Sequence, residues 1–272
     1  MSRKFDIVGA GLGSPALLTA EAAQALAHAD IVLADRRLTA VCPHAEGCAF
    51  SEMAARAVSS GVPATALLVS GDVGFFSAAG RLREQLLPYG EVRLLCGLSS
   101  MQYFCAKCGV PYDDLCVRSL HGRTGSILGA VSYHKRVFVL TGGKQNAQTV
   151  CRALAEAGLG GLTVHLGENL GMEGERVLTD TASALAQQSV LLIEHPAAAN
   201  ACEPVRDAML TRGQVPMTKE EVRWVAVSKL AVQPRDTVWD IGAGTGAVTL
   251  ELARKASDGM VYAVERNAQA LA

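Results

Sequence analysis

The sequence lacks an excess of charge of either sign. Its 25 lysines and arginines are balanced by 26 aspartates and glutamates, which leaves a formal net charge of -1 at pH 7. A protein that binds a nucleic-acid backbone or an anionic membrane usually carries a clear basic surplus, because both partners are polyanions. The balance favours a small or medium-sized ligand, and we expect no nucleic-acid partner and no membrane partner.

A long hydrophobic run and a secretory signal are also missing. The longest stretch without charged residues, residues 57–71, contains serines, glycines and a proline. It is shorter than the roughly 18 apolar residues that cross a bilayer. The first apolar segment begins at Phe5, too early for the charged region, apolar run and cleavage site of a signal peptide. These absences predict a cytoplasmic protein.

Cysteine is present, but not in the pattern of a disulfide framework or a zinc site. Eight cysteines without a secretory signal are expected to be reduced thiols. Cys105 and Cys108 form a tight pair in a helical pattern, with no second pair at zinc-ribbon spacing. We therefore interpret the two as small buried side chains on one helix face and predict no metal site.

What the sequence does contain is an alternation of strand and helix patterns. Half of its 272 residues are hydrophobic, enough for a sizeable core. Apolar, β-branched runs separate the helical patterns and cover residues 5–8, 31–33, 67–69, 92–95, 137–140, 162–166 and 190–193. This order predicts α/β layers with largely parallel sheets.

The organisation along the chain predicts three units. A first α/β half covers residues 1–118 and a second covers residues 119–203. Residues 194–204, EHPAAANACEP, are rich in alanine and proline and are typical of a linker into a third unit, residues 204–272. There Thr218 and Glu221 have the spacing of a capping box before a helix that we expect to end near Leu230.

Two loops have the glycine spacing GxGxG: Gly9, Gly11 and Gly13, and then Gly242, Gly244 and Gly246. The dinucleotide fingerprint needs its third glycine one residue later, so an NAD-dependent oxidoreductase is disfavoured, although Asp35 is tolerably placed for a ribose. A nucleoside without phosphates needs only a close backbone approach, which the tighter spacing permits, and a plain tight turn is the alternative. Ser14 and Pro15 predict a helix directly after the first loop.

The second loop has acidic neighbours. Asp240 precedes Gly242, and Glu265 ends the next strand pattern, where a carboxylate can accept both ribose hydroxyls. Strand, loop, helix, strand and terminal acid resemble the opening of the class I methyltransferases, which bind S-adenosylmethionine. The alternative is an ordinary βαβ turn with a surface glutamate.

Five segments in the first 200 residues carry a second resemblance. They are VGAGLGSP (8–15), VSGDVGFFSAA (69–79), GLSSMQYFCAKCGVPYDDL (97–115), SLHGR (119–123) and GENLGMEGERV (167–177). Their types and order resemble the tetrapyrrole methylase family. The resemblance implies two α/β lobes and methyl transfer from S-adenosylmethionine. SLHGR and GENLG look like the branch that methylates carbon 5 of a corrin precursor in cobalamin biosynthesis.

The third unit looks like the partner of that branch. PMTK (216–219) and WDIGAGTG (239–246) are similar to the enzymes that methylate carbon 15 and decarboxylate the ring-C acetate. The fusion resembles the methyltransferases that act at carbons 5 and 15 of precorrin-6B or precorrin-6Y. We therefore expect a two-lobed tetrapyrrole methylase fold followed by the first part of a class I domain, with the carbon-15 activity absent or crippled.

The family resemblance also implies a cofactor site between the lobes. By motif position its lining residues are Leu12, Ser70, Gly71, Asp72, Val73, Phe75, Ser99 and Ser100, with Leu140 or Thr141 across the cleft. In the third unit the cofactor-binding residues are implied to be Gly242, Gly244, Gly246 and Glu265. A carboxylate such as Asp72 after Gly71 suits either a cationic ligand or an Asx turn.

Substrate contacts are predicted at His121 and Arg123, in a short glycine-flanked turn. Corrin precursors carry acetate and propionate groups, which a guanidinium can bind through two hydrogen bonds. A structural arginine at a helix end is the alternative. The pattern identifies no catalytic residue. The family resemblance implies a homo-oligomer, and the runner-up functions are another substrate within the family, such as uroporphyrinogen or diphthamide, or an oxidoreductase.

Overall fold

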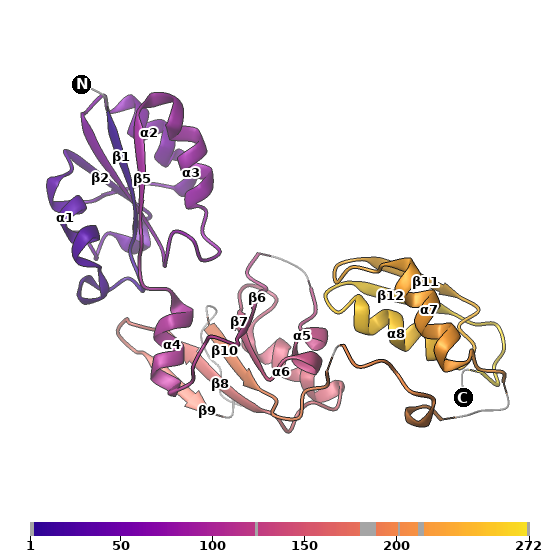
Figure 1. Cartoon of the computed structure of the whole chain (residues 1–272). Helices are drawn as coiled ribbons and strands as arrows, with labels where there is room; N and C mark the ends of the chain where they lie inside the picture. The colour runs from indigo at the N-terminus through magenta and orange to yellow at the C-terminus, as the bar shows by residue number, and fades with distance from the viewer. Residues whose placement is uncertain (1–2, 123–124, 180–188, 201, 212–214, 271–272) are drawn as a thin grey trace.

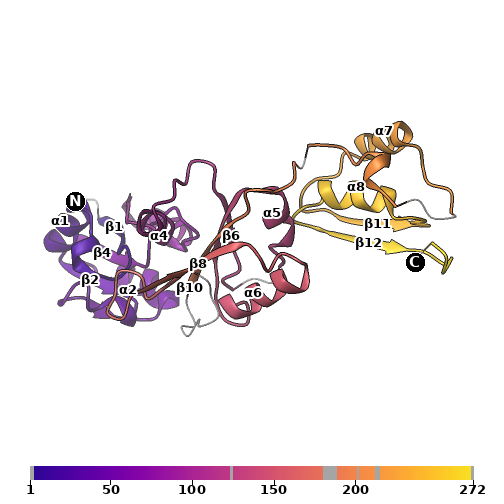
Figure 2. The same cartoon turned by 90° about the horizontal axis from the view of Figure 1, so that it is seen from below.

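The structure is a computed structural model that describes residues 3–122, 125–179, 189–200, 202–211 and 215–270. Figures 1 and 2 show three units that follow one another in chain order: an N-terminal lobe, a middle lobe and a smaller C-terminal unit. Helix α4 (Ser100–Cys108) stands between the first two units (Figure 1).

The first lobe is built on a parallel sheet with the order β3-β2-β4-β1-β5. Its strands are β1 (Lys4–Gly9), β2 (Ile31–Ala34), β3 (Glu46–Gly47), β4 (Ala64–Val69) and β5 (Glu91–Leu95). Helix α1 (Ala20–His28) packs on one face, and α2 (Met53–Ser59) and α3 (Ala79–Leu86) pack on the other. Since both faces are buried, the central strands are apolar almost throughout. Short 3-10 turns cover Pro15–Leu17, Arg36–Leu38, Phe50–Glu52 and Leu87–Tyr89.

The second lobe has a mixed sheet with the order β6-β7-β10-β8-β9. Its strands are β6 (Cys116–Ser119), β7 (Arg136–Leu140), β8 (Thr163–Glu168), β9 (Arg176–Thr179) and β10 (Ser189–Glu194). Helices α5 (Leu128–Tyr133) and α6 (Ala147–Glu156) cover one face. Helix α4 from the first half of the chain packs on the other.

The prediction of largely parallel sheets is wrong for this second lobe. Only β6 and β7 pair in parallel, and β10 is antiparallel to both of its neighbours. Strands β8 and β9 form an antiparallel pair because the short loop 169–175 turns the chain back on itself. The predicted boundary after residue 118 falls within β6, the first strand of the second sheet.

Six of the seven apolar runs lie wholly in strands, the run 162–166 begins one residue before β8, and the predicted α/β layers are confirmed. The prediction of a helix directly after the first glycine loop is wrong in detail. Ser14 and Pro15 begin a short 3-10 turn, and Ser14 makes no side-chain cap bond. Helix α1 begins only at Ala20, after Thr19, whose hydroxyl accepts from the Ala22 amide at 3.1 Å.

The third unit holds α7 (Glu220–Leu230), β11 (Thr237–Ile241), α8 (Ala247–Lys255) and β12 (Met260–Val264), after a 3-10 turn at Asp207–Met209. Helix α7 ends at Leu230 as predicted, but its N-cap is Lys219 and no side chain caps it. The two strands pair in parallel. One face of the pair exposes large apolar side chains: Trp239, Ile241, Met260, Tyr262 and Val264.

The cysteines among the described residues form no disulfide bonds. Cys105 and Cys108 lie on α4, where Cys105 is buried and Cys108 is half-buried, as the sequence predicts. Burial raises the pKa of the Cys108 thiol to about 11. Within the described part of the chain, no helix is both long and apolar enough to cross a membrane.

Candidate functional site

Three loops meet at the carboxyl ends of β1, β4 and β5. The Gly71 amide donates to the Gly11 carbonyl at 2.9 Å, and the Gly11 amide donates back to the Gly71 carbonyl at 3.2 Å. A Cβ atom added at Gly9 would lie 2.6 Å from the Gly97 amide nitrogen. Glycine is required at position 9 because the backbones of the three loops touch there and leave no room for a side chain.

Asp72 links two of these loops. One carboxylate oxygen accepts from the Gly74 amide at 2.9 Å, which closes an Asx turn, and the other accepts from the Gly97 amide at 3.1 Å. Of the two interpretations left open by the sequence, this geometry favours the turn. The second bond, which ties the loop after β4 to the loop after β5, has no signature in the sequence.

The second lobe faces these loops with apolar side chains. Leu12 and Phe75 from the first lobe pack against a cluster that contains Phe138 and, at its edge, Leu140. The rings of Phe75 and Phe138 have centroids 6.1 Å apart. Leu12, Phe75 and Leu140 thus pack against one cluster at the junction of the lobes. The sequence predicted Leu12 and Phe75 on one side of the cofactor cleft and Leu140 on the other.

Other predicted residues have local structural partners. The Thr141 hydroxyl is buried and donates to the Ser189 carbonyl at 2.7 Å. Ser99 is the N-cap of α4, and its hydroxyl accepts from the Gln102 amide at 3.1 Å. Ser100 is the half-buried first residue of that helix, and Val73 packs at the edge of the core on the α3 side. Ser70 is exposed.

Space is open beside Gly71. Its φ is +71°, and a Cβ atom added there would meet no atom within 4 Å. Nearby Phe76 has a φ of 48° and is 48% exposed, with its ring edge on to that of Phe75 at 5.0 Å. An aromatic residue with positive φ is uncommon and marks local strain. Sequence reasoning missed Phe76, although two adjacent phenylalanines stand out in a chain with 5% aromatic residues.

The loop 169–175 between β8 and β9 reaches the first lobe. A Cβ atom added at Gly171 would lie 2.7 Å from the Leu12 Cβ. One added at Gly13 would lie 3.7 Å from the Met172 sulfur. Glu175 at the end of the loop accepts hydrogen bonds that lower its pKa to about 2, mainly from the Gly171 amide and then from Lys107. The sequence motif pointed to this loop but assigned it no contact.

His121 lies on the second lobe just after β6. It is exposed, and its Nδ1 lies so close to Gly142 that a Cβ atom there would collide with it. His121 is therefore beside the carboxyl end of β7, next to Thr141. Arg123, its predicted partner in substrate binding, lies outside the described residues.

The second glycine loop is a separate site. Gly242, Gly244 and Gly246 all have positive φ. The Glu265 carboxylate accepts from the Asn267 amide at 2.7 Å and from the Gly244 amide at 2.8 Å, and these bonds lower the pKa of Glu265. Asp240 accepts from the Thr249 hydroxyl at 2.5 Å.

A cavity of about 70 Å³ lies between the second glycine loop and residues 216–218. It includes Asp240, Gly242 and Gly244 but not Gly246 or Glu265. Ligand pockets usually measure roughly 300 Å³ or more, so this cavity is too small for a nucleoside cofactor.

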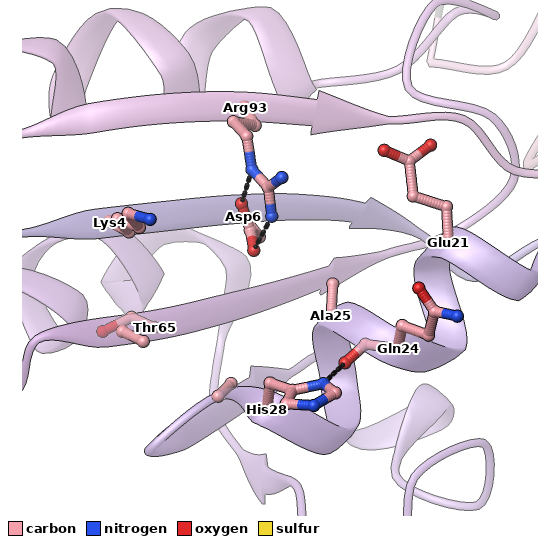
Figure 3. Close-up of a pocket in the computed structure, with 10 residues that line it drawn as sticks. Lys4, Asp6, Glu21, Gln24, Ala25, His28, Thr65 and Arg93 are labelled. Carbon is pink, nitrogen blue, oxygen red and sulfur yellow. Dashed lines mark hydrogen bonds and ion pairs between the residues drawn. The ribbon is translucent and has the colours of Figure 1, made fainter.

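A larger hollow of about 460 Å³ lies between α1 and the sheet of the first lobe (Figure 3). Asp6 and Arg93, on neighbouring strands of its sheet side, share two hydrogen bonds of 2.7 Å, and His28 Nδ1 lies 2.7 Å from the Gln24 carbonyl. The lining includes Lys4 and Ala64, the first residues of β1 and β4. Ligands of open α/β sheets bind at the carboxyl ends of the strands, so this hollow is distinct from the junction.

Comparison with known proteins agrees with the family resemblance. The sequence profile of the Tetrapyrrole (Corrin/Porphyrin) Methylases matches residues 4–186, and that of the Precorrin methyltransferase domain matches residues 208–272. The first match covers more than half of the chain, and the chain belongs to the tetrapyrrole methylase family.

Curated relatives are precorrin methyltransferases that match different lengths of the chain. Cobalt-precorrin-7 C(5)-methyltransferase from Salmonella typhimurium is 32% identical over 181 residues, which are 64% of this chain and 88% of that protein. Precorrin-6Y C(5,15)-methyltransferase (decarboxylating) from Sinorhizobium is 30% identical over 202 residues, 68% of this chain and 47% of that protein. Cobalt-precorrin-6B C(15)-methyltransferase (decarboxylating) from Salmonella typhimurium is 46% identical over 68 residues, 25% of this chain and 35% of that protein.

Solved structures show the two-lobed fold. A precorrin-6Y methylase of cobalamin biosynthesis from Archaeoglobus fulgidus has a TM-score of 0.54 at 20% identity, over 71% of this chain and 98% of that one. A uroporphyrin-III C-methyl transferase from Thermus thermophilus, solved with S-adenyl homocysteine, has a TM-score of 0.55 at 21% identity, over 70% of this chain and 96% of that one. The predicted tetrapyrrole methylase fold is confirmed for the two lobes.

Proposed function

We propose that the two lobes transfer a methyl group from S-adenosylmethionine to carbon 5 of a corrin precursor in cobalamin biosynthesis. One observation carries the proposal. Three glycine-bearing loops meet at one edge of the first lobe, and two of them contribute Leu12 and Phe75 to the cluster that also contains Leu140 of the second lobe. This is the carboxyl edge of a parallel sheet, where open α/β folds bind ligands. The C(5)-methyltransferase relative, 88% of which this chain covers, supports the choice of carbon.

The residues at the junction fit such a cofactor. Space is open beside Gly71, and Ser70 next to it is exposed and can bond to a polar ligand. Leu12, Phe75 and Leu140 offer an apolar wall to an adenosyl group. When bound, S-adenosylmethionine supplies an electrophilic methyl group on a cationic sulfur. The carboxylate of Asp72 lies in the same loop and favours a cation through its charge.

In the proposed reaction the main task of the protein is to position the methyl donor and the substrate. Well-oriented reactants gain up to roughly 7 to 11 kcal/mol from entropy that binding has already removed. The loops fixed by Asp72 and the glycine contacts would hold the donor, and the apolar cluster would exclude water from it. His121, exposed beside Gly142, is placed to contact a substrate carboxylate or accept a proton from the second lobe.

For the third unit we propose the start of a carbon-15 methyltransferase domain. Its matched residues amount to 35% of the C(15)-methyltransferase relative, and the cavity at its glycine loop measures about 70 Å³. We expect the 272-residue chain by itself to catalyse neither carbon-15 methylation nor decarboxylation. We also propose that it acts in the cytoplasm and that it forms a homodimer. Sedimentation can test the homodimer.

The deciding experiment is mass spectrometry of a corrin precursor with a free carbon 5, incubated with the protein and S-adenosylmethionine. One added methyl group without loss of carbon dioxide is the expected product. Two methyl groups with loss of carbon dioxide would contradict the proposal for the third unit. No product, in protein that binds S-adenosylhomocysteine, would assign a different substrate, and binding of NADH instead would favour an oxidoreductase.

A further inference from the structure

The carboxylate of Glu175 gathers three donors from two parts of the chain. Its Oε2 accepts from the Tyr103 hydroxyl at 2.8 Å and from the Gly171 amide at 2.6 Å. Its Oε1 lies 2.9 Å from the Lys107 ammonium. Tyr103 and Lys107 are four residues apart on α4, so they share one helix face, and the ammonium also lies 5.1 Å from the centre of the Tyr103 ring.

The loop that Glu175 closes turns sharply through two residues with positive φ. Asn169 has a φ of 49° and Gly171 has a φ of 73°, and asparagine and glycine adopt this region more readily than other residues. The bond from the Gly171 amide to Glu175 fixes the loop across its own base. Charge-assisted hydrogen bonds of this kind are about twice as strong as neutral ones, so the carboxylate can hold the loop in one conformation.

The same loop presses on the first glycine loop. There is no room for a Cβ atom at Gly171, because Leu12 Cβ and Leu17 Cδ1 would each lie 2.7 Å from it. Met172 approaches Gly13 from the same side. Leu12 in turn packs at the junction with Phe75 and Leu140. A continuous chain of contacts therefore runs from α4 through Glu175 and Gly171 to the proposed cofactor junction.

We infer that Glu175 is a positioning residue, which locks the loop 169–175 onto α4 so that Gly171 holds Leu12 in the geometry that binds the cofactor. This inference rests on the proposed function. Glu175 makes no contact with the reactants in this account, because its three partners are Tyr103, Lys107 and Gly171. Its effect on binding passes through the backbone of the loop.

Calorimetry with S-adenosylhomocysteine tests the inference, with Glu175→Gln as the main variant. Glutamine keeps one acceptor oxygen but loses the charge, and we expect the dissociation constant to rise by about tenfold, as loss of a charged hydrogen bond implies. The matched control is Glu173→Gln, an exposed glutamate of the same loop, which should bind like the wild type. Gly171→Ala, which pushes on Leu12 directly, should weaken binding at least as much as Glu175→Gln.

Hydrogen exchange separates positioning from general stability. In Glu175→Gln, measured well below its thermal midpoint, exchange should accelerate in residues 9–18 and 169–175, while the rest of the protein exchanges as in the control. Tyr103→Phe, which removes one donor but keeps the ion pair, should give a smaller effect in the same direction. Wild-type affinity retained in Glu175→Gln, or a loss of affinity explained by global unfolding, would overturn the inference. Failure of the wild-type protein to bind S-adenosylhomocysteine would instead overturn the proposed function, and the exchange experiment would still test the contact chain.

Discussion

Arg118 and Asp258 form a two-point ion pair between the second lobe and the third unit. The Arg118 Nη2 lies 2.7 and 2.9 Å from the two carboxylate oxygens of Asp258, and its Nε lies 3.1 Å from one of them. Beside this pair, Arg254 of α8 donates to the Asn200 carbonyl at 2.8 Å and lies over the Tyr133 ring. The third unit is therefore fixed on β6 and α5 by polar contacts.

Removing the ion pair should loosen this interface. Arg118→Gln is expected to weaken the packing of the third unit on the second lobe by about 1 to 2 kcal/mol of free energy. This value is toward the low end for charged hydrogen bonds, because the two side chains are 29% and 22% exposed. A protease should then cut the segment 195–204 faster than in the wild type. The double variant Arg118→Asp with Asp258→Arg should recover part of the protection. Equal cutting rates in all three proteins would show that the pair does not hold the units together.

Gly9→Ala should disrupt the cofactor junction. The added Cβ atom would lie 2.6 Å from the Gly97 nitrogen and 2.8 Å from the Gly71 oxygen, and neither backbone atom can move without shifting its loop. We expect the affinity for S-adenosylhomocysteine to fall by at least about tenfold, or about 1.4 kcal/mol.

Gly80→Ala is the matched control for that change. Gly80 lies in α3 with no atom within 4 Å of an added Cβ, so alanine should stabilise the helix by about 0.5 to 1 kcal/mol and leave binding unchanged. Calorimetry and thermal unfolding of both variants measure the difference. Normal binding by Gly9→Ala would place the cofactor away from this junction.

Asp72 variants distinguish a turn residue from a ligand for a cation. Asp72→Asn keeps an oxygen for the Gly74 amide but loses the charge and the acceptor for the Gly97 amide, whereas Asp72→Ala loses both backbone bonds. If the turn is what matters, Asp72→Asn should bind neutral S-adenosylhomocysteine nearly as well as the wild type. Asp72→Ala should be less stable by about 1 to 2 kcal/mol. A selective loss of affinity for cationic S-adenosylmethionine in Asp72→Asn would show instead that the charge serves the sulfonium.

The strands could be predicted where both sides of a strand are buried. In β4 and β10, five consecutive residues are buried, which produces an apolar run that the sequence displays directly. Strand β9 alternates between half-buried and exposed positions at a sheet edge, and only the first of the four residues of β6 is buried, so neither produces such a run. The antiparallel direction of β10 is not encoded in its own residues, because direction depends on how the chain crosses the sheet.

The candidate site could likewise be predicted only in part from the sequence. Motif positions led to Leu12, Phe75 and Leu140, which pack against the same buried cluster, and their contact with a cofactor stays a prediction. Ser99 has a hydroxyl that fits a ligand and a helix cap equally well in sequence, and the structure uses it as a cap. The role of Glu175 was out of reach, because Tyr103, its partner on α4, lies 72 residues earlier in the chain. Such a contact exists only after the two lobes have folded around α4.

Acid should remove the contribution of Glu175 to stability. Its pKa is lowered from 4.5 to about 2, first by the Gly171 amide and then by Lys107, so the folded state favours the carboxylate. A depressed pKa in the folded state gives stability that is fully present above the unfolded value of 4.5 and is lost as pH falls toward 2. Denaturant unfolding of the wild type and Glu175→Gln should therefore differ most at neutral pH, with the difference shrinking once pH drops below about 4.5. Glu173→Gln, measured in parallel, should follow the wild type at every pH, and a gap for Glu175→Gln that stays constant down to the acid limit would mean that the charge of this carboxylate contributes nothing to the loop.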